Sequence, residues 1–328
     1  MKRRIFVASA GGALLGPSAG LRAQSTKTHR VGFLATYSRA NAESFLSLLR
    51  PHLEQLGWID GRNIVLLAPR TIGGDTSRQS SEISELVADR PDLILVQGVP
   101  ATRALLHATK SIPIVMVGVG NPVELGIVSD FARPGGNVTG LSYLANEYSG
   151  KVLQFLKEAA PRLRSVAVFI NPTNEHAAQF FRKMNADAEA LGMRAQRIDI
   201  LGVSDFEPAF AAIRSAGMDS LFMAPEPLIQ SNRDAIGAFA QTNRLPLVTV
   251  GVSSVLPAGG LLAYGPGRNE YAHLAARYVD RLLRGANPGD LAIEQPTRFE
   301  LVINLKTARA LGLPIPQTLL LRATELIQ

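Results

Sequence analysis

Polar and small residues follow the apolar runs that are predicted to be β-strands, and these positions could bind a small molecule. In an open α/β sheet the carboxyl ends of parallel strands meet at one edge, where ligands bind. A helix beginning near Pro100 and Ala101 would leave N–H groups free to hold a carboxylate, and Glu226 could hold an amine. Each position also suits an ordinary loop or helix cap. The segments are Thr36–Ser38, Gly98–Thr102, Asn121–Pro122, Asn171–Asn174, Ala224–Glu226 and Gly251–Val252.

The sequence lacks the motifs that carry catalysis or bind cofactors. Gly251–Val255 departs from G-x-S-x-G at its last position, and Gly118–Gly120 lacks the third glycine of a dinucleotide-binding loop. There is no Walker A sequence and no cysteine, and the five histidines have no metal-ligand spacing. We therefore expect that the chain is not an enzyme and that it binds no metal and no cofactor. Catalytic residues that meet only in the folded chain remain an alternative.

The first 23 residues have the pattern of a secretory signal peptide. Lys2, Arg3 and Arg4 precede a small and apolar run from Ile5 to Leu15, and Ala23 suits a cleavage site. The run is shorter than the roughly 20 residues that span a bilayer. We therefore expect cleavage rather than anchoring. Because the paired arginines also fit a twin-arginine leader, the export route stays open.

Loss of this leader would change the charge of the chain. The leader carries four basic residues and no acidic one, so its removal lowers the formal net charge from +7 to +3. Basic residues do not cluster with aromatic ones, and no nucleic-acid-binding motif occurs, so nucleic acid is not an expected partner. Without cysteine, the exported chain has no disulfide and no lipidated N-terminus. We expect a monomeric periplasmic protein that is not inserted in the membrane.

Short β-rich runs alternate with longer segments of helical periodicity from His29 onward. This alternation predicts parallel sheets with helices on both faces. The expected strands are residues 31–35, 64–68, 93–97 and 114–118, then 166–170, 194–200, 221–224 and 247–250, and finally 299–304. Helices are expected near residues 41–56, 77–88, 148–159, 175–191, 205–215, 232–243 and 271–283.

The breaker-rich segment Arg133–Asn137 separates the two sets of strands. The additional unit at the end suggests that the chain crosses back to the first lobe and then returns, which makes a hinge and a ligand cleft. We therefore expect an α/β fold with two doubly wound parallel-sheet lobes joined by a multi-crossover hinge. The expected lobes are residues 24–138 with 259–292, and 139–258 with 293–328.

Several stretches of the chain resemble one known family over essentially all of the sequence that follows the leader. The most specific are RPGGNVTGLS and FELVINLKTARALGL, and SVAVFINPTN and AGGLLAYGP match as well. They are similar to the ABC-type substrate-binding family that includes the tryptophan and tyrosine importer receptors. The resemblance implies a type I periplasmic-binding-protein fold with three crossovers, which delivers a solute to an ABC permease and its ATPase.

The resemblance also implies a set of ligand-binding residues. By position these are Thr36, Tyr37, Pro100, Ala101, Thr102, Asn121, Asn174 and Glu226, with Tyr264 at a crossover beside the cleft. Asn121 stands where members commonly have Asp, and an aromatic residue that is common near Thr249 and Val250 is missing. Because an Asn side chain has no charge to pair with an ammonium, an organic acid without the amine becomes a credible solute.

Together these features predict a solute receptor that works without a covalent step. Open and closed forms interconvert, and the solute binds the closed form better because both lobes touch it. The expected solute is amino-acid-like or an aromatic acid. The alternative from another class is a periplasmic sensor that reports its ligand to a membrane kinase or chemoreceptor.

Overall fold

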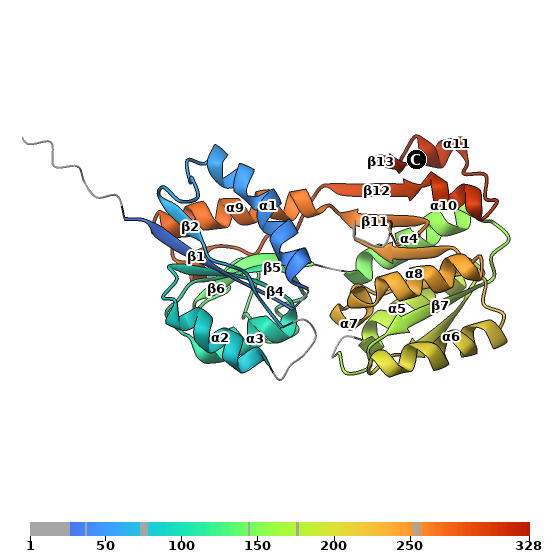
Figure 1. Ribbon diagram of the computed structural model, residues 1–328, viewed down its shortest axis with the longest axis horizontal. Coiled ribbons are helices and arrows are strands. Elements are labelled where there is room, and N and C mark those ends of the chain that lie inside the picture. The colour runs from blue at the N-terminus through green and yellow to red at the C-terminus, as the bar shows by residue number, and fades with distance from the viewer. Residues whose placement is uncertain are drawn as a thin grey trace, which may run out of the picture.

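Two α/β lobes lie side by side, each built on one sheet with helices packed against it (Figure 1). This is the architecture that the alternating sequence pattern predicts. The computed structural model describes residues 27–36, 38–72, 78–143, 145–174, 177–251, 256 and 258–328. The predicted leader, residues 1–23, lies outside these ranges, and so does Tyr37.

The first lobe has parallel strands in the order β2-β1-β4-β5-β6, with β3 also beside β1. The strands are β1 (His29–Ala35), β2 (Ile64–Leu66), β3 (Arg70–Thr71), β4 (Leu93–Gln97), β5 (Ile114–Gly120) and β6 (Val138–Tyr143). The helices are α1 (Arg39–Gln55), α2 (Gln79–Ala88), α3 (Val99–Ala108) and α9 (Arg268–Leu283), with a 3-10 turn at Pro288–Asp290. Phe33 packs with α1 and α9 on one face, and Leu34 packs with α2 and α3 on the other. Apolar strands of this kind are what a sheet covered on both faces requires.

The second lobe has the strand order β13-β12-β11-β10-β9-β7-β8, parallel except for the β11–β12 pair. The strands are β7 (Ser165–Ile170), β8 (Arg194–Asp199), β9 (Leu221–Met223), β10 (Leu247–Val250), β11 (Leu262–Pro266), β12 (Phe299–Asn304) and β13 (Glu325–Ile327). The helices are α4 (Ala145–Ala159), α5 (Ala177–Ala190), α6 (Phe206–Ser215), α7 (Pro227–Ser231), α8 (Arg233–Thr242), α10 (Leu305–Ala310) and α11 (Gln317–Leu320), with a 3-10 turn at Val203–Asp205. One apolar cluster joins this sheet to α4 and α5, and a second joins it to α6 and α8.

Within the described residues the chain passes between the lobes three times. The first passage joins β6 to α4, the second joins β11 to α9, and the third leads from Glu294 to β12. Glu294 is held beside β6, because its N–H donates to the carbonyl of Gly140 at 3.0 Å and its carbonyl accepts the N–H of Ser142 at 2.9 Å. The first and third passages thus leave the first lobe from paired backbone, as expected of a hinge between two rigid bodies.

Sheet membership corrects the expected lobe boundaries in two places. Val138–Tyr143 pairs with β5, so the boundary drawn at residue 138 falls at the start of a strand of the first sheet. Leu262–Pro266 pairs with β10, so residues 262–266 belong to the second sheet and not to the first lobe. The physical reason is that the breakers at Arg133–Asn137 form the turn into one more parallel strand instead of ending the sheet. Backbone pairing, which local sequence pattern does not report, decides both cases.

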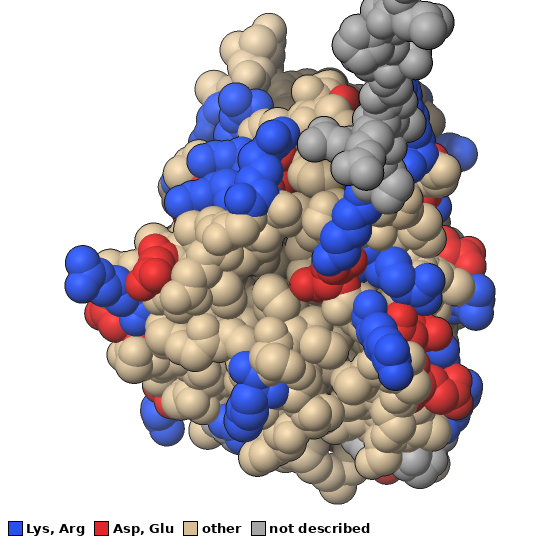
Figure 2. Space-filling view, turned by 90° about the vertical axis from the view of Figure 1, so that its left-hand side faces the viewer, with Lys and Arg blue, Asp and Glu red and all other residues tan. Residues whose placement is uncertain are grey.

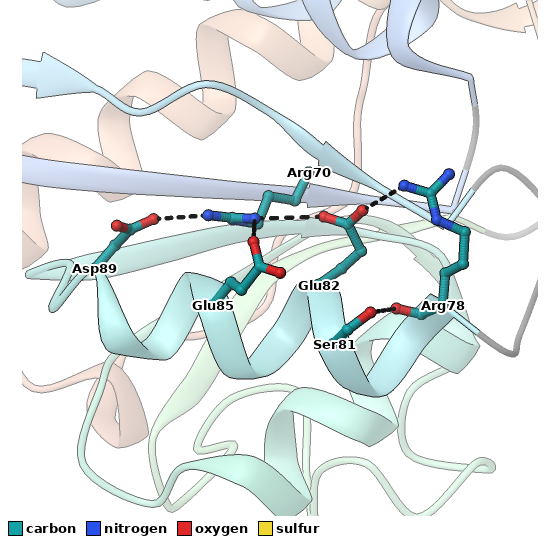
Figure 3. A network of polar contacts seen from close by, with 6 residues as sticks. All are labelled: Arg70, Arg78, Ser81, Glu82, Glu85 and Asp89. Carbon is teal, nitrogen blue, oxygen red and sulfur yellow. Dashed lines mark hydrogen bonds and ion pairs between the residues drawn. The ribbon is translucent and has the colours of Figure 1, made fainter.

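An ion-pair network ties the two-residue strand β3 to helix α2 on the outside of the first lobe (Figure 3). The guanidinium of Arg70 lies 3.1 Å from Asp89 and 3.6 Å from Glu82, and it also contacts Glu85. Burial opposes the charge of Arg70, but the hydrogen bonds that it donates to Asp89 and Glu85 raise its pKa overall. Arg78 pairs with Glu82 at 2.9 Å in the same network. Because the group is partly exposed, we expect it to position the edge strand more than to stabilise the lobe.

Figure 2 shows the end of the first lobe that faces left in Figure 1. Its Lys and Arg side chains lie in small groups, several of them beside Asp or Glu, with uncharged surface between the groups. Ion pairs of this lobe include Lys27–Asp92, Arg50–Asp60 and Arg284–Asp280.

Among the helices of the described ranges, none has the length and apolar character needed to cross a membrane.

Trp58, the single tryptophan, packs against the apolar cluster of α1 and α9 in the first lobe. Its indole N–H donates to the carboxylate of Asp280 at 2.9 Å, and its ring contacts His29 and Arg284. We expect Trp58→Phe to lower the free energy of unfolding by about 1 kcal/mol through loss of this hydrogen bond, and to leave solute affinity unchanged. Urea unfolding and a binding titration check the two parts. A tenfold loss of affinity in a folded variant would place Trp58 in the site.

Candidate functional site

A cavity of about 180 Å³ lies between the lobes, and both lobes line it. From the first sheet and α1 come Asn41, Phe45, Gln97, Val117, Gly118 and Tyr143. From the second lobe come Pro225, Gln230, Val250 and Gly251. The second passage between the lobes contributes Pro266, Arg268 and Tyr271.

Strand ends and helix starts position these side chains. Gln97 is the last residue of β4, Tyr143 is the last of β6, and Val250 is the last of β10. Arg268 begins α9, directly after β11. The cavity therefore lies at the carboxyl edges of both sheets, where open α/β sheets bind ligands.

Flat apolar side chains form the walls of the cavity on the first-lobe side. Phe45 is held by a near-parallel stack on Phe33, with ring centroids 5.5 Å apart. The ring of Tyr271 meets Tyr143 edge-on at 6.5 Å. Gly118 has φ of +72°, and a Cβ there would lie 3.4 Å from the Tyr271 ring. A glycine thus allows that ring to lie close over the end of β5, and the resulting slot suits a planar apolar group.

Gly251 brings the second lobe close to the first at this cavity. It has φ of +84°, and a Cβ at this position would lie 3.5 Å from the hydroxyl of Tyr143. Its N–H donates to the carbonyl of Tyr264 at 2.8 Å, which fixes the loop that follows β10. Any side chain at residue 251 would therefore point toward the opposite lobe.

Arg268 is the one charged side chain among the described residues that line the cavity. Its Nη2 donates to the backbone carbonyl of Asn41 at 2.9 Å, and it forms no ion pair with a described carboxylate. Burial is the main cause that lowers the pKa of its guanidinium, and repulsion from Arg233 of the second lobe adds to the effect. The cavity thus combines apolar walls, neutral amides and one cation.

The described residues predicted to bind ligand in the first lobe are not among those that line the cavity. Thr36 is buried, and its hydroxyl donates to the carbonyl of Gln97 at 2.9 Å, so it orients the strand end that carries a lining residue. Ala101 and Thr102 are fully buried, and the Thr102 hydroxyl donates to the carbonyl of Gly98 at 2.9 Å. Pro100 is exposed at the start of α3. The structure thus gives the start of α3 a packing role.

Asn121 also lies outside the cavity lining. Its backbone has φ of +21°, a conformation that Asn tolerates better than most residues. Its side-chain amide donates to the carboxylate of Glu124 at 2.7 Å. The side chain therefore caps its own turn.

The predicted residues of the second lobe form a polar link and an aromatic contact. The carboxylate of Glu226 accepts the N–H of Asn171 at 3.0 Å and a hydrogen bond from Asn174. Burial raises the pKa of Glu226 to about 7. Tyr264 packs between Phe155 and Phe299, with centroid distances of 5.1 and 5.9 Å. Tyr37 lies outside the described residues.

Among the lining residues, sequence reasoning included Pro225 and Gly251, within the segments Ala224–Glu226 and Gly251–Val252, and did not select the others. Gln97 carried a usable signal, since it is a polar residue that closes the apolar run 93–96. Gly118 was considered only as part of a dinucleotide-binding loop, whose pattern Gly118–Gly120 does not match. Arg268 and Tyr271 could not be found locally, because their place in the cavity depends on the chain's return to the first lobe after β11.

The buried carboxyl of Glu226 makes stability depend on pH. The folded-state pKa of about 7 exceeds the ordinary value of 4.5, so between these pH values the folded chain holds a proton that the unfolded chain has released. The contribution of Glu226 to the free energy of unfolding is therefore fully present below pH 4.5. It is lost as pH rises through 7, which lowers the free energy of unfolding by up to about 3 kcal/mol. We expect Glu226→Gln to remove this decline, whereas Glu207→Gln, an exposed position in the same lobe, keeps it. Urea unfolding at pH 5, 6, 7 and 8 checks this, and parallel curves for wild type and Glu226→Gln would contradict it.

Comparison with known proteins connects this two-lobed fold and cavity to a family. The family model described as ABC transporter substrate binding protein matches residues 50–327. The chain belongs to this family. The resemblance inferred from the sequence is thereby confirmed.

Relatives of this substrate-binding protein agree with the assignment. The chain is 29% identical over 266 residues to a tyrosine-binding protein of Clostridioides difficile (strain R20291). The aligned region covers 80% of this chain and 74% of that protein. The chain resembles the solved structure of a conserved domain protein from Vibrio cholerae O1 biovar El Tor with a TM-score of 0.83 and 26% identity, over 92% of this chain and 100% of that one. It also resembles an ABC domain from Streptococcus pneumonia in complex with L-Trp, with a TM-score of 0.82, 21% identity and the same coverage. The fold is that of type I periplasmic binding proteins.

The described residues hold no group of His, Asp and Glu side chains arranged to bind a metal ion. What the cavity offers a ligand is therefore apolar surface, amide groups and the Arg268 guanidinium. This arrangement can hold a small organic molecule by contact and hydrogen bonding.

Proposed function

We propose that this chain is the periplasmic solute-binding component of an ABC importer, which holds a small organic solute between its lobes. The observation that carries the proposal is the cavity lined by both lobes and by the second passage between them. A solute there touches both lobes at once, so it binds a closed form better than an open one and shifts the population toward closure.

The size and lining of the cavity support a solute with one ring. Its volume is about 180 Å³, and a cavity of about 150 Å³ in another protein accommodates benzene. Phe45 and Tyr271 provide apolar walls, while Gln97 and Gln230 offer amide groups that can orient polar substituents. An amino-acid-like compound or an aromatic acid fits this description.

Membership of a family of ABC transporter substrate-binding proteins supports an ABC permease and its ATPase as the partners. Closure would present a surface that an ABC permease recognises, and the ATPase would then drive transfer of the solute. The leader pattern of residues 1–23 supports export to the periplasm. No bond in the solute is broken in this cycle, so the bound compound leaves unchanged.

The test is a thermal-shift screen of the full chain against amino acids, aromatic acids, amides and sugars. A compound that binds should stabilise the fold by about 2.7 kcal/mol at 100 times its dissociation constant. Small-angle scattering with the bound compound should show a more compact particle, and chromatography should recover the compound unmodified. A conversion product would contradict the binding role, and failure of every compound to bind would contradict the proposed function.

A further inference from the structure

The guanidinium of Arg268 is a half-buried cation without a counter-charge. Among the described residues, Arg268 donates one hydrogen bond, from Nη2 to the carbonyl of Asn41 at 2.9 Å. A guanidinium has five N–H donors, so most of its donors remain available. A buried charge that lacks an ionic partner is unfavourable, and an anion delivered by a ligand would satisfy it.

The causes that lower the pKa of Arg268 include a second cation and no carboxylate. Arg233 of the second lobe is near enough to oppose ionisation of Arg268. Among the described residues that line the cavity, none is Asp or Glu. An anion between the lobes would therefore be attracted by both arginines, and it would relieve the repulsion that opposes closure.

Two carboxylates near the cavity, those of Glu226 and Glu124, are engaged elsewhere. Glu226 follows Pro225, a lining residue, but its carboxyl bonds Asn171 and Asn174, and burial raises its pKa to about 7. Glu124 accepts a hydrogen bond from the side chain of Asn121 outside the lining. An ammonium group placed in the cavity would thus meet no free carboxylate among the described lining residues, and would approach two arginines.

From this arrangement we infer that Arg268 binds the carboxylate of the solute, and that the solute is a one-ring carboxylate without an ammonium group. The ring lies against Phe45 and Tyr271, and the carboxylate pairs with the guanidinium at the start of α9. This inference rests on the proposed function, whose solute class it narrows from amino-acid-like compounds and acids to the acids. Arginine suits the task because its planar donors match a carboxylate in a bidentate geometry.

The experiment is an isothermal titration of the full chain at pH 6.0, where α-amino groups are protonated and carboxyl groups are ionised, with four probes that share one skeleton. These are 3-phenylpropanoate, which is an anion; 3-phenylpropanamide, which is neutral; L-phenylalanine, which is a zwitterion; and L-phenylalaninamide, which is a cation. We expect 3-phenylpropanoate to bind at least about tenfold more tightly than each of the others, since a charged hydrogen-bonded pair is stronger than a neutral one.

Variants of the helix that carries Arg268 assign the effect. Arg268→Gln should weaken 3-phenylpropanoate binding by about tenfold or more and change binding of the amide by less than about twofold. Arg268→Lys keeps the charge and should restore part of the affinity for the anion. Arg281→Gln removes the same charge from the exposed face of α9, about 20 Å along the helix, and should change neither. A role limited to holding α9 on Asn41 would weaken both probes equally.

The outcomes distinguish failure of the inference alone from failure of the proposed function. Equal affinity for the anion and the amide, or tighter binding of L-phenylalanine, overturns the inference. If none of the four probes binds but a sugar or another neutral compound from the wider screen does, the proposed receptor role stands and the inference is wrong. If no compound binds at all, both are wrong. Because the wild-type comparison needs no mutation, a variant that fails to fold does not block the test.

Discussion

Gly140→Ala is expected to lower the free energy of unfolding by roughly 4 kcal/mol, a loss diagnostic of backbone disruption. A Cβ at this residue of β6 would lie 2.3 Å from the carbonyl oxygen and 2.5 Å from the nitrogen of Met116 on β5. Both atoms belong to a strand in the middle of the sheet, so neither can move without breaking the ladder. The φ of +130° adds strain for any residue other than glycine.

Gly126→Ala is the matched control for this prediction. Gly126 has φ of +64°, but its Cβ would meet nothing within 4 Å. It therefore carries the backbone strain alone, which costs about 1 to 2 kcal/mol. Urea unfolding of both variants measures the difference. If Gly140→Ala costs no more than Gly126→Ala, the close approach of β5 and β6 does not exist, and the placement of β6 in the first lobe is wrong.

Gly251→Leu is expected to weaken solute binding by about 100-fold, or roughly 2.7 kcal/mol. The new side chain would start 3.5 Å from the Tyr143 hydroxyl and would point from the second lobe toward the first. It would thus occupy cavity space and hold the lobes apart, while the folded lobes themselves lose only the strain energy of a positive φ. Titration of 3-phenylpropanoate, together with the tightest compound of the wider screen, measures the loss.

Gly192→Leu controls for that strain. Gly192 lies in the same lobe with φ of +66°, is exposed, and has open space at its Cβ position. It should lose stability to a similar extent and keep its affinity. Equal affinity in the two variants would show that the cavity between the lobes is not the solute site.

Aromatic rings connect the lobes where the chain passes between them. Tyr143 at the end of β6 lies 6.0 Å from Tyr148 on α4, Tyr148 lies 5.0 Å from Phe299 on β12, and Phe299 stacks on Tyr264 of β11. Rings in such contact are worth more than their buried area alone. Tyr264, which the resemblance placed beside the cleft, contributes to this packing at the hinge, and Tyr143 joins the ring chain to the cavity lining.

The sequence by itself determined the class of fold and the family. Alternation of apolar runs such as Leu93–Gln97 with amphipathic helices depends on local periodicity, which a sheet covered on both faces requires. Family-specific stretches such as RPGGNVTGLS then identified the two-lobed receptor. Strand ends were also predicted to face the ligand, and the cavity does lie at the carboxyl edges of both sheets.

Only the tertiary structure decided which side chains line the cavity. Ala101 and Thr102 stand at a helix start that suits an anion, yet packing against the first sheet buries them. Arg268 has no local signal, and it enters the cavity because β11 belongs to the second sheet while α9 packs on the first. A residue on a crossover takes its position from the pairing of strands distant in sequence, and that pairing is a property of the folded chain rather than of any local pattern.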